Sequence, residues 1–262
     1  MLELEQVLTQ VKEWCKEVGM IQLEKLNSKL EIQRKSDEID LVTEVDRLSE
    51  GLLIDRIKKN YSEHSILSEE SGKKDKNSEY LWIIDPIDGT TNYANGFFIF
   101  SISIALQYQG KTVLGVVYAP KLDYLYSAIK GEGAYLNGER IKVSSAQNLK
   151  ESILATGFPY DRASDPNNNI DNFSRLIIQV RGIRRTGSAA LDLCNVAQGA
   201  FNGYWELKLK LWDIAAGLLI VEEAGGKAIT SYEGNGINVI AGNKKIVELL
   251  AEQLIVKWTF SE

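Results

Sequence analysis

Acidic residues gather at three places in the sequence, each beside an apolar run. They are Glu69 and Glu70 after Ser65–Ser68, Asp85 and Asp88 after Leu81–Ile84, and Asp213 after Trp212. Strand ends and helix starts are rigid places to hold such side chains. Two carboxylates about 5 Å apart repel by about 3 kcal/mol at an effective dielectric of about 20. Several carboxylates gathered in one cleft therefore require a cation.

The available ligand types favour a hard cation. Carboxylate and carbonyl oxygens, without histidine or cysteine nearby, select Mg²⁺ over zinc or copper. The chain has a single histidine, His64, which excludes His-rich zinc sites and two-histidine phosphatase mechanisms. His64 lies in a polar turn before an apolar run, and we expect it at the surface. The expected cofactor is Mg²⁺.

The segment from Asp85 to Thr90 is suited to bringing ligands together. Pro86 fixes one backbone torsion and Gly89 permits an unusual one, so Asp85 and Asp88 can face a common point with the Ile87 carbonyl. Taken alone, this segment is also typical of a simple turn. In the same way, Asp213 alone fits a helix N-cap and the Glu69–Glu70 pair a solvated surface. The prediction depends on the three clusters acting together.

Hydrophobic periodicity predicts the helices near the N-terminus. Apolar residues recur at three- and four-residue intervals through most of residues 1–30 and again over 44–61, which indicates two amphipathic helices. The run at 81–84 predicts a buried strand that ends at Asp85. Further strands are predicted in the middle third of the chain, at 99–108, 112–118 and 124–128, with a hairpin at Asn137-Gly138.

Strands and helices alternate in the last third of the chain. Strands are predicted at 152–156, 201–205, 226–230 and 238–241, and helices at 169–180, 188–198, from 213 and from 244. No repeat or low-complexity linker divides the sequence. We therefore expect one layered α+β unit over residues 1–262, with approximate halves 1–145 and 146–262. The first half would carry a large antiparallel sheet and the metal motifs, and the second the substrate pocket.

Composition excludes several classes of partner. Of the 262 residues 44% are hydrophobic, enough for a sizeable core, but no run approaches the length of a membrane span. The N-terminus resembles no targeting peptide, so we expect a cytoplasmic protein. A formal charge of −6 argues against nucleic acid as a main partner. Cys15 and Cys194 lie in apolar helical patterns and are expected to be buried, reduced thiols.

Two motifs resemble the signatures of the inositol monophosphatase family. They are WIIDPIDGTTN at 82–92 and WDIAAG at 212–217. The resemblance extends over nearly the whole chain. Further matching segments are DLVTEVD at 40–46, SEES at 68–71, GEGAY at 131–135, NG at 137–138 and GIRRTGSAA at 182–190.

The resemblance implies a fold and a set of metal ligands. The fold is an α-β-α-β-α layered sandwich with mixed sheets. Glu69, Asp85 and the Ile87 carbonyl would hold a first Mg²⁺ ion, and Asp85, Asp88 and Asp213 a second. Glu69, with Glu70 beside it among the candidate catalytic residues, would assist a weaker third ion. By the same resemblance Asp46 and Thr90 would orient the attacking water.

The resemblance also implies where the substrate binds. The phosphate would lie on the metals and on backbone N–H groups around Gly89 and Thr90, and Glu206 would accept hydrogen bonds from hydroxyls of the alcohol. The loop that lines the pocket matches Gly187, Ser188 and Ala189. Arg184 would bind a second anionic group or pair with an acid; Lys35 would close over the metals or be a plain surface lysine. Leu211 departs from the proline that often precedes the second motif.

The expected activity is hydrolysis of myo-inositol monophosphate to myo-inositol and phosphate. Metal-activated water would attack phosphorus directly, because paired ions can stabilise both the attacking and the leaving oxygen. The alternatives on the same metal site are hydrolysis of fructose-1,6-bisphosphate, of the NADP 2'-phosphate or of 3'-phosphoadenosine 5'-phosphate. An alternative of another class is a non-catalytic interaction protein on this scaffold. A homodimer and sensitivity to lithium are expected by resemblance.

Overall fold

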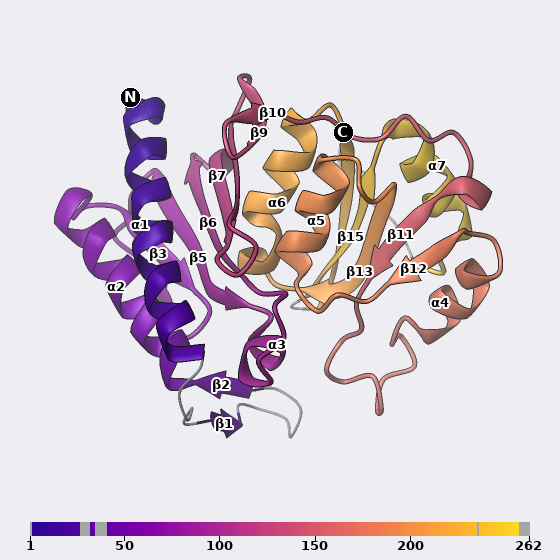
Figure 1. Ribbon diagram of the computed structural model, residues 1–262, viewed down its shortest axis with the longest axis horizontal. Helices are drawn as coiled ribbons and strands as arrows, with labels where there is room; N and C mark the ends of the chain where they lie inside the picture. The colour runs from indigo at the N-terminus through magenta and orange to yellow at the C-terminus, as the bar shows by residue number, and fades with distance from the viewer. Residues whose placement is uncertain (1, 27–31, 35–40, 235, 257–262) are drawn as a thin grey trace.

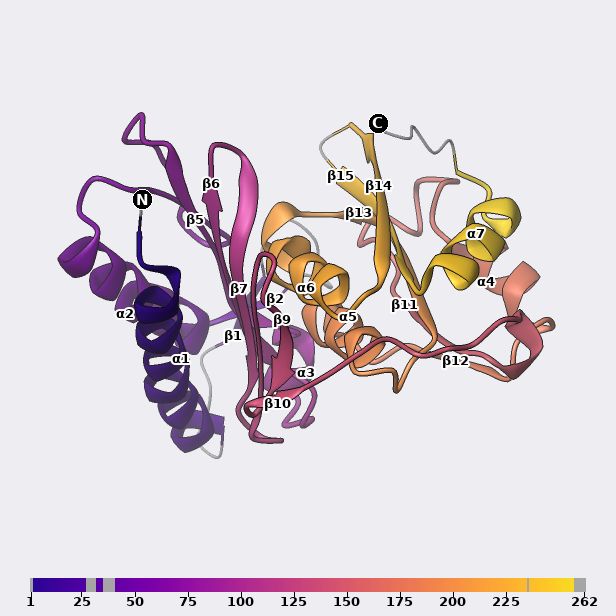
Figure 2. The same ribbon diagram turned by 90° about the horizontal axis from the view of Figure 1, so that it is seen from above.

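Two large β-sheets alternate with three layers of helices in the computed structural model, which describes residues 2–26, 32–34, 41–234 and 236–256 (Figure 1). Helices α1 (Leu4–Leu26) and α2 (Glu44–Asn60) form one outer layer. Helices α5 (Ala189–Ala197) and α6 (Leu211–Glu223) lie between the sheets, and α4 (Ile170–Ile177) and α7 (Lys244–Gln253) form the other outer layer. Figure 2 shows the same order from above. The predicted five-layer α-β-α-β-α architecture is confirmed.

The larger sheet contains eight strands in the order β10-β9-β8-β7-β6-β5-β3-β4. Their bounds are β3 Ser65–Ser68, β4 Gly72–Lys74, β5 Tyr80–Asp88, β6 Ser101–Tyr108, β7 Lys111–Ala119, β8 Tyr124–Ile129, β9 Gly133–Leu136 and β10 Glu139–Arg140. Neighbouring strands are antiparallel except β3 and β5, which run parallel. The predicted large antiparallel sheet is therefore a mixed one, and its parallel pair ends at the same edge.

The smaller sheet contains five strands in the order β12-β11-β13-β15-β14. Their bounds are β11 Ile153–Thr156, β12 Gly182–Arg184, β13 Gly203–Leu209, β14 Lys227–Glu233 and β15 Gly236–Gly242. Strand β11 is parallel to β12 and β13, and β15 is antiparallel to β13 and β14. A separate pair, β1 (Ile32–Arg34) and β2 (Leu41–Thr43), and the short helices α3 (Thr90–Ala94) and η1 (Leu149–Glu151) complete the described elements.

Burial of one helical face explains the outer layer. Helix α1 buries Val7, Val11, Trp14, Cys15 and Val18. This helix contacts α2 and strands β6, β7 and β8, so its apolar stripe covers one face of the large sheet. Each fully buried aliphatic side chain contributes about 1.5–3 kcal/mol relative to exposure. The predicted amphipathic helices at both positions are confirmed where the structure describes them.

The middle helices are apolar on most sides because both sheets cover them. Helix α6 contacts β5 to β9 of the large sheet and β14 and β15 of the small one. Helix α5 packs beside α6 and against β11, β13 and β15. One hydrophobic cluster joins residues from both sheets and both helices. Each half of the chain therefore depends on the other for its core.

Strand β5 is longer than predicted. Instead of ending at Ile84 it continues to Asp88, with a shift in its pairing: Asp85 lies opposite Ser103, and Asp88 lies opposite Ser101. Between these pairs β5 advances three residues while β6 advances two, so β5 contains a β-bulge. The extra residue bends the strand and redirects its side chains. Apolar patterning did not predict this extension because three of the four extra residues, Asp85, Pro86 and Asp88, are acidic or proline.

His64 is less exposed than its polar neighbours predicted. Its ring is half-buried and stacks between Tyr61 and Tyr80, with centroids 5.1 Å and 4.6 Å away. The Trp82 indole Nε1 donates to His64 Nδ1 over 3.1 Å. Burial lowers the pKa of His64, so the neutral ring that accepts this bond is favoured.

Two smaller expectations concern thiols and membranes. Cys15 and Cys194 are buried and unpaired, as predicted. Among the described residues, none of the helices has the length and apolarity that crossing a bilayer demands.

Candidate active site

The parallel strands β3 and β5 bring the first two acidic clusters to one edge of the large sheet. Ile84 lies beside Ser68 in the pairing, and the Glu69 N–H donates to the Ile84 carbonyl over 3.2 Å. Asp85 follows on β5 and is buried. Glu69 and Asp85 therefore emerge from adjacent strand ends. The backbone N–H of Glu70 donates to Glu50 Oε2 over 2.9 Å, which links this turn to α2.

Asp88 connects the end of β5 to the start of α5. Its carboxylate accepts hydrogen bonds from Ser188 Oγ at 2.6 Å, Ala190 N at 2.7 Å and Ala189 N at 3.2 Å. The N-terminus of a helix favours a negative group through its N–H donors and its dipole. Burial nevertheless raises the pKa of Asp88 to about 6, against the lowering effect of these bonds and of Arg185. The site thus holds a carboxylate that the protein alone does not fully compensate.

Asp46 and Thr90 form a hydrogen-bonded pair, as their predicted shared role requires. Thr90 Oγ1 lies 2.9 Å from Asp46 Oδ1 and 3.0 Å from the Ile87 carbonyl oxygen. Asp46 also accepts from the Thr43 N–H at the start of α2, at 2.8 Å. This capping interaction fixes the Asp46 rotamer. The Thr90 hydroxyl is therefore held between two acceptors at the first residue of α3.

Asp213 lies in the first turn of α6. Its Oδ2 accepts a hydrogen bond from the Lys210 N–H over 2.7 Å, so Asp213 is the third residue of the helix and Lys210, not Asp213, is the N-cap. Burial raises the pKa of Asp213 well above its usual range; the Lys210 bond opposes this effect, and the charges of Asp88, Glu69 and Glu206 add to it. Asp213 therefore also belongs electrostatically to the acidic group at the sheet edge.

Gly89 lets the two halves of the molecule approach each other. Its φ of +96° lies in the left-handed region that favours glycine, and a Cβ here would lie 3.0 Å from the Gly187 carbonyl oxygen. Asn92 bridges the same junction, because its Nδ2 donates to the carbonyl oxygens of Ile99 at 2.7 Å and Thr186 at 2.8 Å. The loop before α5 is thus fixed beside the start of α3.

Glu206 projects from β13 into the far side of the site. Tyr204 donates from its hydroxyl to Glu206 Oε2 over 2.7 Å. Burial raises the pKa of Glu206 to about 7, while Tyr204 and Arg185 lower it. A Cβ at Gly157 would lie 2.0 Å from Glu206 Oε1, so glycine leaves the space that this carboxylate occupies. Glu206 is therefore a positioned acceptor that titrates near neutral pH.

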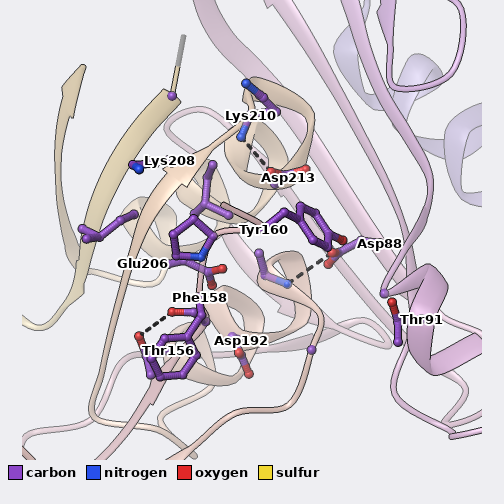
Figure 3. A pocket seen from close by; sticks show the side chains of 18 of the residues that line it. Asp88, Thr91, Thr156, Phe158, Tyr160, Asp192, Glu206, Lys208, Lys210 and Asp213 are labelled. Carbon is purple, nitrogen blue, oxygen red and sulfur yellow. Dashed lines mark hydrogen bonds between the residues drawn. The ribbon is translucent and has the colours of Figure 1, made fainter. Parts of the chain in front are cut away.

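A cleft of about 980 Å³ joins these groups. Its lining includes ten of the predicted residues: Glu69, Asp85, Ile87, Asp88, Gly89, Thr90, Gly187, Ala189, Glu206 and Asp213. The lining does not include four other predicted residues, Asp46, Glu70, Arg184 and Ser188. Two of these are buried behind lining residues: Asp46 accepts a hydrogen bond from Thr90, and Ser188 donates one to Asp88. Figure 3 shows Asp88, Asp213 and Glu206 around the cavity. Lys35 falls outside the described residues.

Several lining residues were not predicted from the sequence. Arg185 lines the cleft where Arg184 was expected, and Asp192 contributes a buried carboxylate that accepts from Thr186 Oγ1 at 2.7 Å. Phe158, Tyr160 and Lys208 also line the cleft. The sequence carried one signal for Arg185, its place in the GIRRTGSAA segment, but not which of the two arginines faces inward.

The donor set fits a hard divalent cation. Burial, followed by the charges of Glu69, Asp88 and Asp213, raises the pKa of Asp85 well above its usual range. In the described part of the chain, no three carboxylate, histidine or cysteine side chains already converge in a metal-binding arrangement. Asp88 and Asp213 instead accept bonds from N–H donors. The lining carboxylates and the Ile87 carbonyl are all oxygen ligands, as Mg²⁺ prefers, and a cation would relieve their mutual repulsion.

Comparison with known proteins agrees with this geometry. A family model described as the inositol monophosphatase family matches residues 3–256. A protein of Haemophilus influenzae named "Nus factor SuhB" is 43% identical over 220 residues, which cover 82% of each chain. A protein of Aquifex aeolicus named "Fructose-1,6-bisphosphatase/inositol-1-monophosphatase" is 41% identical over 222 residues, 84% of each chain.

A solved structure extends the similarity to the backbone. The inositol monophosphatase from Anabaena (Nostoc) sp. PCC 7120 superposes with a TM-score of 0.87 at 38% sequence identity, covering 97% of both chains. The layered arrangement and the elements that carry the acidic residues are therefore shared with that protein.

Proposed function

Because this chain belongs to the inositol monophosphatase family, we propose that it is a Mg²⁺-dependent phosphomonoesterase. Its proposed reaction is hydrolysis of myo-inositol monophosphate to myo-inositol and phosphate, by direct attack of water on phosphorus. The observation that carries the proposal is the group of buried acidic residues in one cleft, where burial and mutual repulsion raise the pKa of Asp85 and Asp213. Such a group suits cations and the phosphate that they attract.

The predicted ligands remain our assignment for the metal. Glu69, Asp85 and the Ile87 carbonyl would hold one Mg²⁺ ion, and Asp85, Asp88 and Asp213 a second, with Glu69 assisting a weaker third. Magnesium bound there supplies Lewis-acid stabilisation of charge on the phosphoryl oxygens and lowers the pKa of water. This contribution amounts to several kcal/mol, so turnover depends on it.

The Asp46–Thr90 pair positions the attacking water in this proposal. Asp46 Oδ1 accepts a hydrogen bond from Thr90 Oγ1 over 2.9 Å. The hydroxyl oxygen therefore keeps a lone pair that can accept a hydrogen bond from water. The start of α3 offers the backbone N–H groups of Gly89 and Thr90 to the phosphate. The rigid bulge of β5 keeps both features beside Asp88.

Glu206 would recognise the alcohol. When ionised, its carboxylate accepts hydrogen bonds from hydroxyl groups, and the Tyr204 hydroxyl fixes its orientation. Gly187 and Ala189 line the same cleft, while Ser188 acts behind it on Asp88. A polyol with several hydroxyls matches these acceptors better than an apolar alcohol does.

Two other functions have specific support. The name of the Aquifex aeolicus protein includes fructose-1,6-bisphosphatase, which favours this bisphosphate as the next candidate substrate. The name "Nus factor SuhB" of the Haemophilus influenzae protein favours a second role as a Nus factor, performed on the same scaffold beside catalysis. Neither role requires a different metal site.

The assembly and location of the chain complete the proposal. We propose a cytoplasmic homodimer that lithium inhibits. Phe97 and Phe98 lie in the middle third of the chain, 44% and 46% exposed, with ring centroids 4.7 Å apart. Adjacent exposed aromatic rings of this kind are enriched at protein interfaces.

The deciding experiment measures phosphate release with and without Mg²⁺. The substrates are myo-inositol 1-phosphate, fructose-1,6-bisphosphate, NADP and 3'-phosphoadenosine 5'-phosphate, with lithium added to the active reactions. Magnesium-dependent hydrolysis of the first substrate supports the proposal. Hydrolysis of another substrate alone would keep the metal chemistry and reject the inositol phosphate; no hydrolysis of any would reject the phosphatase.

A further inference from the structure

Lys208 occupies an irregular point of β13, next to the proposed alcohol site. Between Glu206 and Leu209 the strand advances three residues while β15 advances two, from Val239 to Ile237. The extra residue forms a bulge, and Lys208 takes a φ of +60°, in the left-handed region. Its N–H donates to Asn238 Oδ1 over 3.0 Å. A lysine is uncommon in this conformation, which favours glycine or asparagine.

The Lys208 side chain leaves the bulge to bind a neighbouring segment. Its Nζ lies 2.9 Å from Asp161 Oδ2 and 2.7 Å from Asp165 Oδ2, and the side chain is 14% exposed. Burial disfavours the charge, but the hydrogen bonds to Asp165 and Asp161 outweigh it and raise the pKa of Lys208. The same bonds lower the pKa of Asp165. Lys208 and Asp165 therefore stay charged at neutral pH.

The bound segment, residues 157–169, joins β11 to α4 and lines the cleft with Phe158 and Tyr160. Asn169 Nδ2 donates to the Gly157 carbonyl over 2.6 Å and thereby holds the two ends of the segment together. Asn167 Nδ2 donates to Glu233 Oε1 over 2.7 Å. Lys208 supplies ion pairs in the middle of the segment. Figure 3 shows Phe158, Tyr160, Glu206 and Lys208 around one cavity.

The charges on this wall of the cleft do not favour a second phosphate. Around segment 157–169 the cleft lining carries the acidic residues Asp161, Asp165, Glu206 and Glu233 and the basic residues Arg162, Lys208 and Lys210, a net charge of −1 when all are ionised. Lys208 is the buried cation among them, and two carboxylates compensate it at hydrogen-bond distance. A dianionic group placed here would face more carboxylates than cations, and the Lys208 ammonium is already bound by two of those carboxylates.

We infer that Lys208 is a positioning residue that sets the substrate preference of this site. Its ammonium holds segment 157–169 against the Glu206 side of the cleft. Its two aspartate partners give that wall a net negative charge, so the site favours a monophosphate of a neutral polyol over a bisphosphate. This inference rests on the proposed phosphatase function, and it assigns to the segment a role in selecting the alcohol end of the substrate.

Three variants of the full chain test the positioning role. Lys208→Gly removes the ammonium and suits the left-handed backbone, so it does not endanger folding. Lys208→Arg keeps a cation for the same carboxylates. The matched control is Lys227→Ala, at an exposed position of β14. Hydrogen exchange of residues 157–169 reports on the segment without reference to activity. Initial rates with myo-inositol 1-phosphate and Mg²⁺ give KM and kcat separately.

The expected results differ between the variants. In Lys208→Gly, exchange of the segment accelerates and KM rises about 3- to 10-fold, while kcat changes less than about 2-fold, because uniform substrate binding is lost. Lys208→Arg restores both values, and Lys227→Ala changes neither. Unchanged exchange and unchanged KM in Lys208→Gly would overturn the positioning role.

A fourth variant tests the charge argument. Asp161→Asn with Asp165→Asn frees the Lys208 ammonium, and we expect the ratio of kcat/KM for fructose-1,6-bisphosphate to that for myo-inositol 1-phosphate to rise about 3- to 10-fold. A constant or falling ratio would overturn the selectivity. If the unchanged protein hydrolyses neither compound, the proposed function and the selectivity fail together. The exchange measurement alone then decides whether Lys208 holds the segment.

Discussion

Replacement of Asp88 by Asn removes a charge from the site with little change of shape. Burial raises the pKa of Asp88 from its usual 3.8 to about 6. A carboxylic acid whose pKa is raised on folding stabilises the fold below its unfolded pKa, and this stability is lost as the pH rises through about 6. At about pH 7.5 the difference of about 2 in pKa corresponds to about 3 kcal/mol of destabilisation by the charge.

The amide of the variant has an opposing effect. The carboxylate accepts from Ser188 Oγ and from the N–H groups of Ala189 and Ala190, whereas an asparagine offers one acceptor oxygen. One buried donor left unsatisfied costs about 1–3 kcal/mol. We therefore expect the metal-free variant to unfold with a free energy equal to that of the unchanged protein or up to about 2 kcal/mol higher.

Activity should respond in the opposite direction. If Asp88 holds Mg²⁺ as proposed, its loss should lower the rate of phosphate release from myo-inositol 1-phosphate by about 1,000-fold or more, which corresponds to several kcal/mol. Urea denaturation in EDTA measures stability, and phosphate release with Mg²⁺ measures turnover. Asp55→Asn, at an exposed position of α2, is the matched control and should change neither.

Either of two results would refute this reasoning. Full activity of Asp88→Asn would remove Asp88 from the metal site. A loss of more than about 3 kcal/mol in EDTA would show that the buried charge stabilises the fold, contrary to the burial argument.

Three further predictions test other parts of the molecule. Because the pKa of Glu206 is about 7, KM for inositol phosphate should fall as the pH rises through about 7, and Glu206→Gln should abolish this dependence. Gly157→Ala places a Cβ 2.0 Å from Glu206 Oε1, so KM should rise about 10-fold or more with a smaller change in kcat, measured by initial rates. Burial lowers the pKa of His64 from its usual 6.5, so the unfolded chain binds the proton more readily and the free energy of unfolding should decrease as the pH falls below about 6.5; urea denaturation at two pH values should show a weaker decrease in His64→Phe.

Periodic apolar residues predicted most of the fold because one buried face defines each long element. The helices α1 and α2 and the longer strands of both sheets lie within a few residues of their predicted positions. The short strands β1, β2, β4 and β12 were not predicted, since three residues carry too little pattern to identify them. Strand β5 was predicted too short because its last residues include Asp85, Pro86 and Asp88, which are rare inside strands.

In the candidate site, residue types were predictable from the sequence, whereas tertiary contacts were not. Five carboxylates that line the cleft were predicted from their types and motifs, whereas four others were not: those predicted are Glu69, Asp85, Asp88, Glu206 and Asp213, and the others are Asp161, Asp165, Asp192 and Glu233. The donors that hold Asp88 lie at residues 188–190, and the sequence alone does not show this contact. Lys208 gave no signal, because a lysine in a strand pattern does not reveal a left-handed bulge. Arg184 and Arg185 are adjacent, and the structure shows which one lines the cleft.

The contact between Asp88 and the start of α5 has a consequence for biosynthesis. Asp88 and its hydroxyl donor Ser188 are separated by 100 positions along the chain. During translation the carboxylate therefore leaves the ribosome well before its donors are made, at about 5–20 residues per second. The acidic edge of the large sheet cannot mature until the middle helices have been synthesised and have docked. Catalytic competence thus arises late, as a property of the finished chain.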